Sequence, residues 1–515
     1  MEGYSVGIDF GTCSIKVSHY DSARQNIRQL KLDKSDNNSD YKVPNVIEYR
    51  GRTEYLVGAR AKKNKVYNLK HIVDLIKRKL ELESWSRSFQ ELGFTLSAQE
   101  IATDIFQWIK ARIEEQGRPV EHAVITVPVC FTEIQKAKVV QAAKEAGINI
   151  KDTITEPVAA LFSVEELFGE ACDENVVVFD FGGATLDLCL FHLENDGEGH
   201  IDIDIETSAG IDLGGVDFTE MLYRDVLYPK HKEEIDREIR DDILNQMEAE
   251  FLETAERMKV ELFEDEEESC QNSFQMKYNA GNVDVELTLE EAIQCLERHQ
   301  VKEQIVAALD ALFEDSSDIE KEDVTMVKTF GGTSRIRYIR EILEEYFGED
   351  VFDQEDYDSD EAYHAVADGA ARYLGILLDE DSDVSISNAI PYYVGVNQNG
   401  CFKPVIKRNQ KYGIFTPYRG LPEIVDLEAD CWRVVLYQSF SEENSRIEAE
   451  NGAVYLGEIL LEKEKYEGYD AYLYKFGTTD KGKVVGKFFG VTEENTPVLL
   501  EEKEIIVGGM TSWKR

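Results

Sequence analysis

The strongest constraint on the fold is an internal repetition of one short pattern. Residues 8–20 read IDFGTCSIKVSHY and residues 179–191 read FDFGGATLDLCLF. Each segment combines an apolar strand, an Asp-Phe-Gly turn and a second alternating strand. One such turn is often only a hairpin turn. Two matched copies far apart, with Asp9 and Asp180 as equivalent acids, predict two similar lobes that present acidic hairpins to a shared cleft.

The chain up to residue 378 alternates between helical and strand patterns. Helical spacing occurs at 97–116, 132–147, 157–168 and about 231–263. Buried strands are indicated by AVITVP at 123–128 and VTMVKTF at 324–330. Helices that alternate with apolar strands in this way are typical of an α/β fold. We therefore predict an α/β domain over residues 1–378.

The composition and the hydrophobic pattern of the sequence change after this domain. Residues 379–388 read DEDSDVSISN, a short polar segment that predicts an acidic interdomain linker over 379–389. Residues 390–515 contain short alternating runs rich in Tyr, Val, Ile and Phe, separated by Gly, Pro and Asn. That pattern is typical of an all-β sandwich or barrel.

Composition excludes several classes of function. The chain has 56 Lys and Arg against 102 Asp and Glu, a net charge of −46. Nucleic acid and anionic membrane surfaces attract clustered cations, so neither is expected as a partner. No apolar run approaches the roughly 20 residues of a membrane helix, and no signal-peptide pattern is present. Eight Cys without a CxxC pair, and eight His without ligand spacing, predict no disulfide framework, no structural metal and a cytoplasmic location.

The two Asp-Phe-Gly turns have the composition of phosphate-binding loops. Glycine lets the backbone approach a phosphate, and the N–H groups of such a turn form an anion-binding nest. The hydroxyls of Thr12 and Thr185 could add hydrogen bonds. The Asp carboxylates need a bridging cation, and Mg²⁺ is held through one or two carboxylates together with phosphate oxygens. A third loop, Gly331-Gly332-Thr333-Ser334-Arg335, could pack a base against bare backbone, although each such turn alone is weak evidence.

Together these motifs resemble the actin-like ATPases, and among them the seventy-kilodalton heat-shock (DnaK-type) chaperones. The resemblance covers about residues 1–378, and it continues more faintly through 386–408. It rests on VGIDFGT, AVITVPVCFTEIQKAKVVQAAKEAGI, ITEPVAAL, VVVFDFGGATLDL, SAGIDLGGVDF, AERMKVELF and FGGTSRI. It implies a two-lobed actin-like (ribonuclease-H-like) ATPase domain over 1–378. A β-sandwich domain like the family's substrate-binding domain, without a helical lid, is expected over 390–515.

The resemblance also implies a role for each matching residue. ATP hydrolysis would depend on Lys77, Glu156, Asp180, Thr185 and Asp187, with Arg78 as the alternative to Lys77 because the match there is loose by one residue. Asp9 and Asp180 would hold Mg²⁺ through water. ATP or ADP would be contacted by Asp9, Gly11, Thr12, Cys13, Gly182, Gly183, Gly214, Gly215, Glu256, Lys259, Gly331, Gly332 and Arg335. Among these, the guanidinium of Arg335 would stack on adenine.

Simpler interpretations of some of these residues remain open. Without the family, Lys77 reads as an exposed helical lysine beside Arg78. Glu156 reads as an acid at a helix N-terminus. Glu256 and Lys259 read as a surface pair at helical spacing.

Several positions depart from the family pattern. Val260 and Phe263 stand where the family has an Arg and a Ser against adenine, which predicts weaker ATP binding than is usual for the family. Cys13 replaces a Thr and Ala184 replaces a Gly in the two turns. Asp152 stands where the family uses an Arg to dock J-domain co-chaperones. The resemblance implies a J-domain co-chaperone and a nucleotide-exchange factor as partners, and the charge reversal at Asp152 argues against the J-domain partner.

Three hypotheses about function follow. In the first, a slow Mg²⁺-dependent ATPase controls a β-domain that binds peptides or a protein client. In the second, a weakly hydrolysing or non-hydrolysing adaptor binds ATP and holds one dedicated partner. In the third, the chain is a filament-forming actin relative, which the β region argues against.

Overall fold

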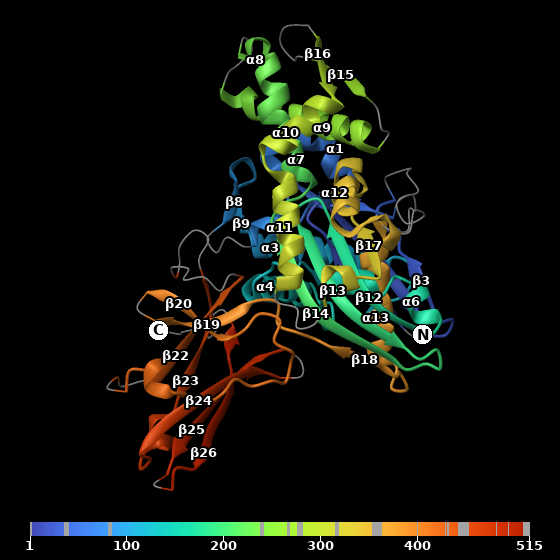
Figure 1. Cartoon of the computed structure of the whole chain (residues 1–515). Helices are drawn as coiled ribbons and strands as arrows, with labels where there is room; N and C mark the ends of the chain where they lie inside the picture. The colour runs from blue at the N-terminus through green and yellow to red at the C-terminus, as the bar shows by residue number, and fades with distance from the viewer. Residues whose placement is uncertain are drawn as a thin grey trace.

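The computed structural model in Figure 1 contains a mixed α/β body and a β-rich module formed by the C-terminal part of the chain. The structure describes residues 3–34, 41–80, 85–236, 241–264, 268–275, 282–314, 319–352, 363–398, 400–427, 429, 432–440, 447, 453–479, 482–492 and 494–507. None of the helices in these ranges combines the length and the apolar character that crossing a membrane requires.

The first lobe is built on a sheet in the order β11-β10-β1-β2-β3, with β4 paired to β2. Its strands are β1 (Tyr4–Phe10), β2 (Ser14–Asp21), β3 (Asn26–Gln29), β4 (Val43–Pro44), β10 (Val120–Val127) and β11 (Ile150–Thr155). The β1–β2 pair is an antiparallel hairpin, whereas β10 pairs with β1 in parallel. The end of β10 is buried on both sides, as expected for a parallel strand covered by helices.

The second lobe repeats this arrangement in a sheet of order β17-β12-β13-β14-β18. Its strands are β12 (Cys172–Phe181), β13 (Leu186–Asn195), β14 (Ile201–Ile211), β17 (Met326–Phe330) and β18 (Val384–Ser387). The β12–β13 pair is an antiparallel hairpin, and β17 joins β12 in parallel just as β10 joins β1. The two Asp-Phe-Gly turns therefore occupy equivalent positions, as the repeated sequence pattern predicts.

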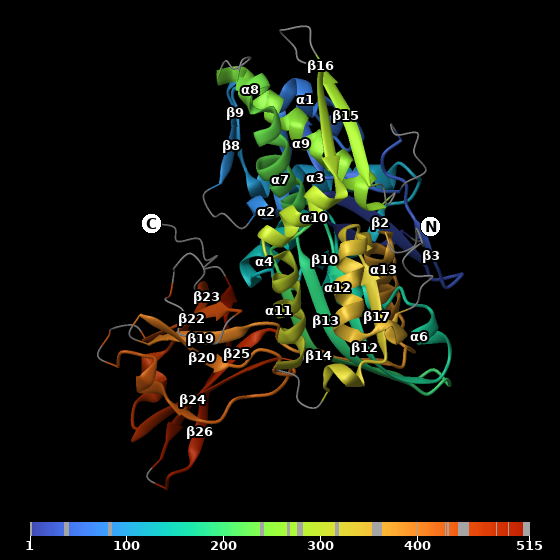
Figure 2. The ribbon, with the colours of Figure 1, turned by 45° about the horizontal axis from the view of Figure 1, so that its top comes forward.

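Helices fill the space between the sheets and cover their outer faces. Helices α5 (Glu156–Leu161) and α13 (Ala365–Leu378) contribute to an apolar core with β12, β13 and β14. Figure 2 shows α11 (Val301–Glu314) and α12 (Arg337–Phe347) along the second sheet. The other helices used below are α1 (Ala59–Asn68), α2 (Ile76–Lys79), α3 (Ala98–Glu114), α4 (Glu133–Glu145), α6 (Glu166–Gly169), α7 (Gly215–Leu222), α8 (Tyr228–Asp236), α9 (Asp241–Glu264) and α10 (Leu289–Arg298).

Each of two predicted helices corresponds to two helical segments among the described residues. The predicted helix 157–168 is α5, which ends at Leu161, followed by the short α6. At this break the Ser163 hydroxyl donates to the Ala160 carbonyl, a local hydrogen bond that competes with helix continuation. The predicted helix 231–263 is divided between α8 and α9, and residues 237–240 lie outside the described part of the chain.

The C-terminal module contains two antiparallel sheets. One has the order β20-β19-β22-β23-β27, and the other has the order β21-β24-β25-β26. A single apolar core draws side chains from both sheets, including Val394, Val434 and Phe488. The strands are β19 (Tyr393–Gln398), β20 (Cys401–Ile406), β21 (Arg419–Gly420), β22 (Trp432–Ser439), β23 (Val454–Leu461), β24 (Ala471–Thr478), β25 (Val484–Val491), β26 (Pro497–Glu504) and β27 (Ile506–Val507).

The segment predicted as a linker is partly ordered as a strand. Within 379–389, β18 pairs in parallel with β14, so that Val384 lies opposite Ile201 and Ile386 lies opposite Ile203. Both apolar side chains pack against the core between the lobes. Within the segment predicted as an acidic linker, the alternating apolar residues Val384 and Ile386 thus complete the edge of the second sheet.

The contact between α13 and α5 depends on a glycine. A Cβ on Gly369 would collide with the carbonyl oxygen of Ala159, which is a backbone atom and cannot rotate away. We predict that Gly369→Ala destabilises the protein by about 1–3 kcal/mol, the usual effect of overpacking. Chemical denaturation measures this loss. Gly169→Ala is the matched control because a Cβ there meets nothing, and an equal loss in both variants would contradict the prediction.

Candidate functional site

A cavity of about 840 Å³ lies between the two hairpin turns. Most of the residues that the sequence predicts for nucleotide binding line this cavity: Asp9, Gly11, Thr12, Cys13, Glu156, Asp180, Gly182, Gly183, Thr185, Gly215, Glu256, Lys259, Gly331 and Gly332. Four predicted residues, Lys77, Asp187, Gly214 and Arg335, are not among the lining residues. The sequence-based set is thus largely brought together in one place.

The first hairpin carries an acid and a base that face each other. Asp9 is the second-last residue of β1, and Lys16 lies directly opposite on β2. The ammonium of Lys16 is 2.7 Å from Asp9 Oδ2; the Asp9 side chain is buried, and that of Lys16 is 13% exposed. Although burial opposes it, the Asp9 carboxylate raises the pKa of Lys16 and keeps the lysine charged. Sequence reasoning missed Lys16. Its position opposite Asp9 in the predicted hairpin was the sequence signal that could have identified it.

The second hairpin carries two acids on neighbouring strands. Asp180 on β12 pairs across the hairpin with Asp187 on β13. Asp187 Oδ1 accepts a hydrogen bond of 2.6 Å from the Val129 amide, while its Oδ2 is buried and has no hydrogen-bond partner among the described residues. Burial, followed by the charge of Glu156, raises the pKa of Asp187 to about 7. The same two causes raise the pKa of Asp180 well above its usual range.

Lys77 is the buried partner of this acidic cluster. It lies on α2 with 1% of its side chain exposed, and its Nζ is 2.5 Å from Glu156 Oε1. Arg78 points elsewhere and donates to Asp217 and to the Ala184 carbonyl oxygen of the second lobe. The interpretation of Lys77 as an exposed helical lysine is therefore wrong, and of the two candidates only Lys77 forms an ion pair with a predicted catalytic acid.

The charges of this cluster do not balance among the described residues. Asp9, Glu156, Asp180 and Asp187 supply four carboxylates, and among the described residues Lys16 and Lys77 are the ammonium groups that form ion pairs with them. Two negative charges remain if all the groups ionise. A buried excess of this size raises carboxylate pKa values, as it does here, unless a cation enters. The excess and the oxygen-rich donor set both fit one Mg²⁺ ion.

A second wall of the cavity comes from α9. Lys259 Nζ donates to the Gly215 carbonyl oxygen and to Glu256 Oε2, each at 2.8 Å. Lys259 is buried, so the interpretation of this pair as a simple surface pair is wrong. Val260 and Phe263 line the same wall, at the positions where the sequence departs from the family.

The glycine loop after β17 supplies the opposite wall. Gly331 has φ of +84°, and a Cβ there would collide with the Phe181 carbonyl oxygen, so glycine is required. Arg335 lies 4.7 Å from the ring centroid of Tyr363. Tyr363 itself lines the cavity, and sequence reasoning missed it. The guanidinium of Arg335, which the sequence predicts to stack on adenine, therefore lies over the ring of Tyr363 instead. Tyr363 becomes a candidate nucleotide contact.

Basic side chains reach the cavity from parts of the chain that no motif marks. The additional cationic lining residues are Lys42, Lys62, Lys65, Lys79 and Arg87. Lys65 on α1 also pairs with Asp74 at 2.9 Å and with Glu253 of α9 at 3.5 Å. Although the chain has a net charge of −46, these cationic side chains gather around one cavity. No local sequence signal could have found them, because the fold alone brings them together.

Comparison with known proteins agrees with this geometry. The fold defines the general structural class of the protein: two similar α/β lobes around a cleft lined by acidic residues, followed by a β-rich module. A family model described as "Hsp70 protein" matches residues 83–414, and the chain belongs to this family. It is a divergent member: it is 27% identical over 438 residues to the chaperone protein DnaK of Stenotrophomonas maltophilia. That alignment covers 79% of this chain and 65% of the relative, so the chain spans less than two thirds of the relative's length.

The elevated pKa of Asp187 predicts an unusual dependence of stability on pH. Because its folded-state pKa of about 7 exceeds the ordinary 3.8, the ligand-free folded protein binds more protons than the unfolded chain between these values. Stability should therefore fall as the pH rises through this window. Asp187→Asn should raise the free energy of unfolding at pH 8 by at least about 1 kcal/mol, because one pKa unit corresponds to roughly 1.4 kcal/mol. At pH 4 the gain should disappear.

Urea denaturation of the ligand-free protein between pH 4 and pH 8 measures this effect. The control is Asp173→Asn, which removes an acid on the same hairpin whose side chain is 76% exposed. It should leave the pH dependence unchanged. An unchanged pH dependence in Asp187→Asn as well would show that Asp187 is not the responsible group.

Proposed function

We propose that this protein binds and hydrolyses ATP in the cleft, and that nucleotide state controls a β-sandwich module that binds a peptide or protein client. The proposal rests mainly on the buried cluster of four acids and two lysines between the turns. It is supported by the assignment to the Hsp70 family. The proposed ATPase domain is 1–378, the linker is 379–389, and the β module is 390–515.

The chain's own residues account for the chemistry. A bound Mg²⁺ would neutralise phosphate charge and orient the phosphate oxygens, with Asp9 and Asp180 holding it through water. The N–H groups of the two turns and the Thr12 and Thr185 hydroxyls would cradle the phosphates. Lys77 would place a positive charge beside the γ-phosphate and the attacking water. Catalysis of this type is positioning and electrostatic stabilisation, without a covalent intermediate.

The proton of the attacking water needs an acceptor in the same cluster. Asp187 is suited to that role because its Oδ2 lacks a hydrogen-bond partner and its pKa is raised to about 7. A base with a pKa near the working pH is efficient at proton transfer. Glu156 would hold Lys77 in place, since the two atoms of their ion pair are 2.5 Å apart.

The nucleoside would lie between the walls formed by α9 and the Gly331–Gly332 loop. Glu256 and Lys259 would bind the ribose, and Tyr363 would face the base. Val260 and Phe263 stand where the family has an Arg and a Ser, so two polar contacts to adenine would be lost. The affinity for ATP should therefore be lower than is usual for proteins of the family. An apolar wall favours stacking over hydrogen bonding, which leaves phosphate contacts to supply most of the affinity.

Contacts between the body and the β module offer a route for coupling. Lys411 donates to the Ile205 carbonyl oxygen and pairs with Glu206, each at 3.0 Å, and both acceptors belong to β14. Arg408 donates to the Ser208 carbonyl oxygen on the same strand. On the other side of the junction, the Glu133 amide at the start of α4 donates to Gln438 of β22 at 3.1 Å.

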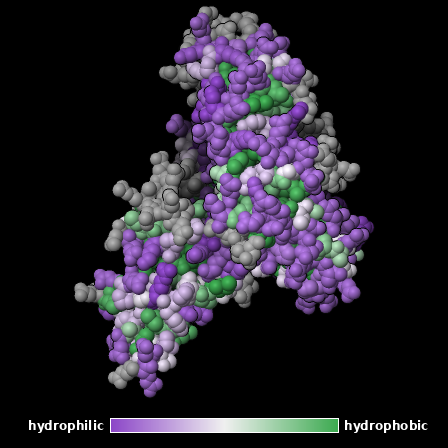
Figure 3. Space-filling model, in the orientation of Figure 1, coloured by the Kyte–Doolittle hydropathy of each residue, from purple (hydrophilic) through white to green (hydrophobic). Residues whose placement is uncertain are grey.

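A client would bind to the β module through strand edges and apolar positions. Among its exposed apolar side chains are Ile414, Tyr418 and Leu499. On the face shown in Figure 3, hydrophobic residues gather in small separate patches among hydrophilic ones. An extended peptide adds main-chain hydrogen bonds to a sheet edge and uses small apolar pockets for its side chains.

The dedicated adaptor remains the second candidate function. Asp152, where the family docks J domains through an Arg, accepts a hydrogen bond of 2.9 Å from the Tyr373 hydroxyl. A carboxylate held at this position would repel an acidic co-chaperone surface. Without a J-domain partner, ATP turnover would stay slow, and one stable partner would replace a cycle of client binding and release.

Single-turnover ATP hydrolysis tests the proposed chemistry. With Mg²⁺ present, Asp180→Asn and Lys77→Ala should each slow turnover by at least about a hundredfold, the usual loss for a group that stabilises charge in a transition state. Lys70→Ala is the control, because Lys70 is 75% exposed and contacts Glu91 outside the cavity. ATP binding by the wild type without turnover would favour the adaptor. Absence of ATP binding would refute the proposed site.

Peptide release tests the proposed coupling. ATP should accelerate the release of a fluorescent unfolded peptide from the wild type, and Lys411→Ala should reduce this acceleration about tenfold. The reason is that a hydrogen bond to a charged group contributes about 1.5–3 kcal/mol, and 1.4 kcal/mol is a factor of ten. Lys407→Ala, an exposed lysine of the same loop, is the control. If the wild type bound no unfolded peptide, the adaptor would be favoured.

A further inference from the structure

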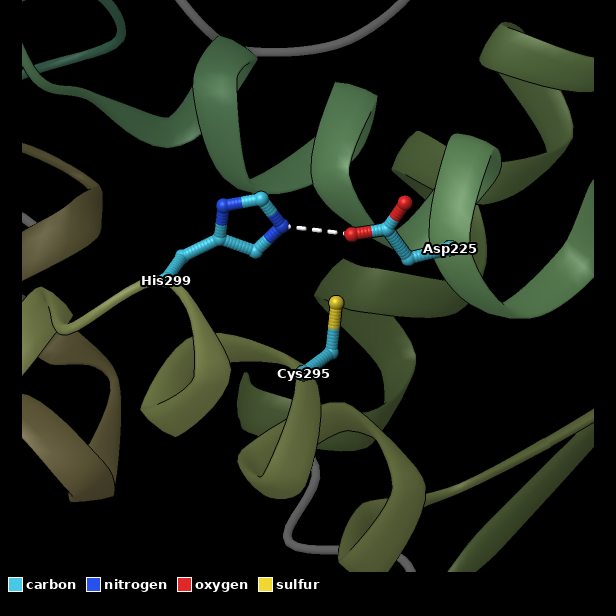
Figure 4. Close-up of side chains that lie close together, drawn as sticks. All are labelled: Asp225, Cys295 and His299. Carbon is cyan, nitrogen blue, oxygen red and sulfur yellow. Dashed lines mark hydrogen bonds and ion pairs between the residues drawn. The ribbon is translucent and has the colours of Figure 1, made fainter.

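Three potential metal ligands converge away from the cleft, in the outer part of the second lobe. They are Asp225, Cys295 and His299, and their ligand atoms all lie within 4.8 Å of one another. His299 Nε2 and Asp225 Oδ2 are 2.6 Å apart. Figure 4 shows the sulfur of Cys295 directed toward the gap beside this pair. The nucleotide cavity uses none of the three residues.

The local structure explains why these side chains meet. Cys295 lies in the last turn of α10 and His299 is its C-cap residue, so the two are four residues apart on one helix face. The carbonyl of His299 accepts a hydrogen bond of 2.9 Å from Gln304, which fixes the end of the helix. Asp225 lies in the π-helical turn Tyr223–Leu227 between α7 and α8. Such π-helical turns are rare and occur frequently at functional sites.

The set of donor atoms selects a class of metal ion. Thiolate, imidazole and carboxylate together suit Zn²⁺ and other borderline transition-metal ions, whereas Mg²⁺ and Ca²⁺ prefer oxygen ligands alone. Three protein ligands leave one tetrahedral position for water or another donor. The second possible group, Asp173, His192 and Glu194, has no thiol and does not select in this way.

Access to the site is also suitable. Cys295 is fully buried, while the side chains of Asp225 and His299 are 42% and 37% exposed. An ion can therefore arrive from solvent and meet the thiol at the bottom of the site. Metal–ligand bonds of about 2.0–2.3 Å require the three ligand atoms to lie somewhat closer than 4.8 Å.

We propose that Asp225, Cys295 and His299 form a binding site for a zinc-class transition-metal ion. Binding replaces the hydrogen bond between His299 and Asp225 with two bonds to the metal, and the Cys295 thiol becomes a thiolate by releasing its proton to the solvent. The ion then joins α10 to the π-helical turn, which continues into α7. Because α7 begins at Gly215 in the nucleotide cavity, a metal here also stiffens one wall of the cleft.

Cobalt titration of the full chain tests the site, because Co²⁺ bound by a thiolate absorbs strongly in the near ultraviolet and Zn²⁺ does not. After dialysis against a chelator, one equivalent of Co²⁺ should produce this charge-transfer band, and one equivalent of Zn²⁺ should abolish it. Cys295→Ser should lose the band. His299→Ala should weaken Co²⁺ binding at least about tenfold, since even outer-shell partners contribute 10–100-fold.

Cys270→Ser is the matched control. Cys270 is a buried thiol of the same apolar core, and it donates to the Met258 carbonyl oxygen instead of facing the site. It should bind Co²⁺ like the wild type. A wild-type protein without the band would overturn the proposal. A band that survives in Cys295→Ser would do the same. If Cys295→Ser fails to fold, the half-exposed His299→Ala still decides, because unchanged affinity would refute the site.

Discussion

The rest of the structure depends on one electrostatic constraint, the gathering of four carboxylates in the cleft. Asp9, Asp180 and Asp187 come from the two central hairpins, and Glu156 begins the helix between the two sheets. Carboxylates so close together are tolerated in a buried site only when ammonium groups and hydrogen bonds offset them. Lys16 and Lys77 do this in part. The remaining negative charge raises the pKa values of the carboxylates, and the divalent cation of the proposed function would offset it.

The order of strands in the second sheet joins this site to the far end of the molecule. Asp180 is the second-last residue of β12, Asp187 is the second residue of β13, and β14 separates β13 from the linker strand β18. The β module attaches to β14 itself through Lys411 and Arg408. Only one strand therefore lies between the strand that carries the proposed base and the segment that leads into the β module. In the proposed function, a shift of the cleft hairpin would reach the junction through the main-chain hydrogen bonds between β13 and β14.

The sequence predicted the lobes and most of the cleft because both rest on local, repeated motifs. The Asp-Phe-Gly turns fix backbone geometry where they stand, so Asp9, Asp180 and Gly331 were found without tertiary information. Tyr363 and the cationic lining residues were missed because side chains from distant segments meet there only after folding. The cluster of Asp225, Cys295 and His299, proposed above as a metal site, was not predicted from the sequence for the same reason. Cys295 and His299 are at helical spacing, but their third partner, Asp225, is 74 residues from His299.

The pairing of β18 with β14 has a consequence for any state in which the β module separates from the body. With β18 in place, β14 is an interior strand of the second sheet. Without it, β14 becomes a long edge strand with a row of unpaired N–H and C=O groups. Exposed edges of this kind recruit strands from other chains, and proteins protect them against aggregation. The linker strand β18 therefore covers the edge of β14 within the same chain. Release of β18 would also expose the backbone groups of β14, with which a strand of a second polypeptide could pair.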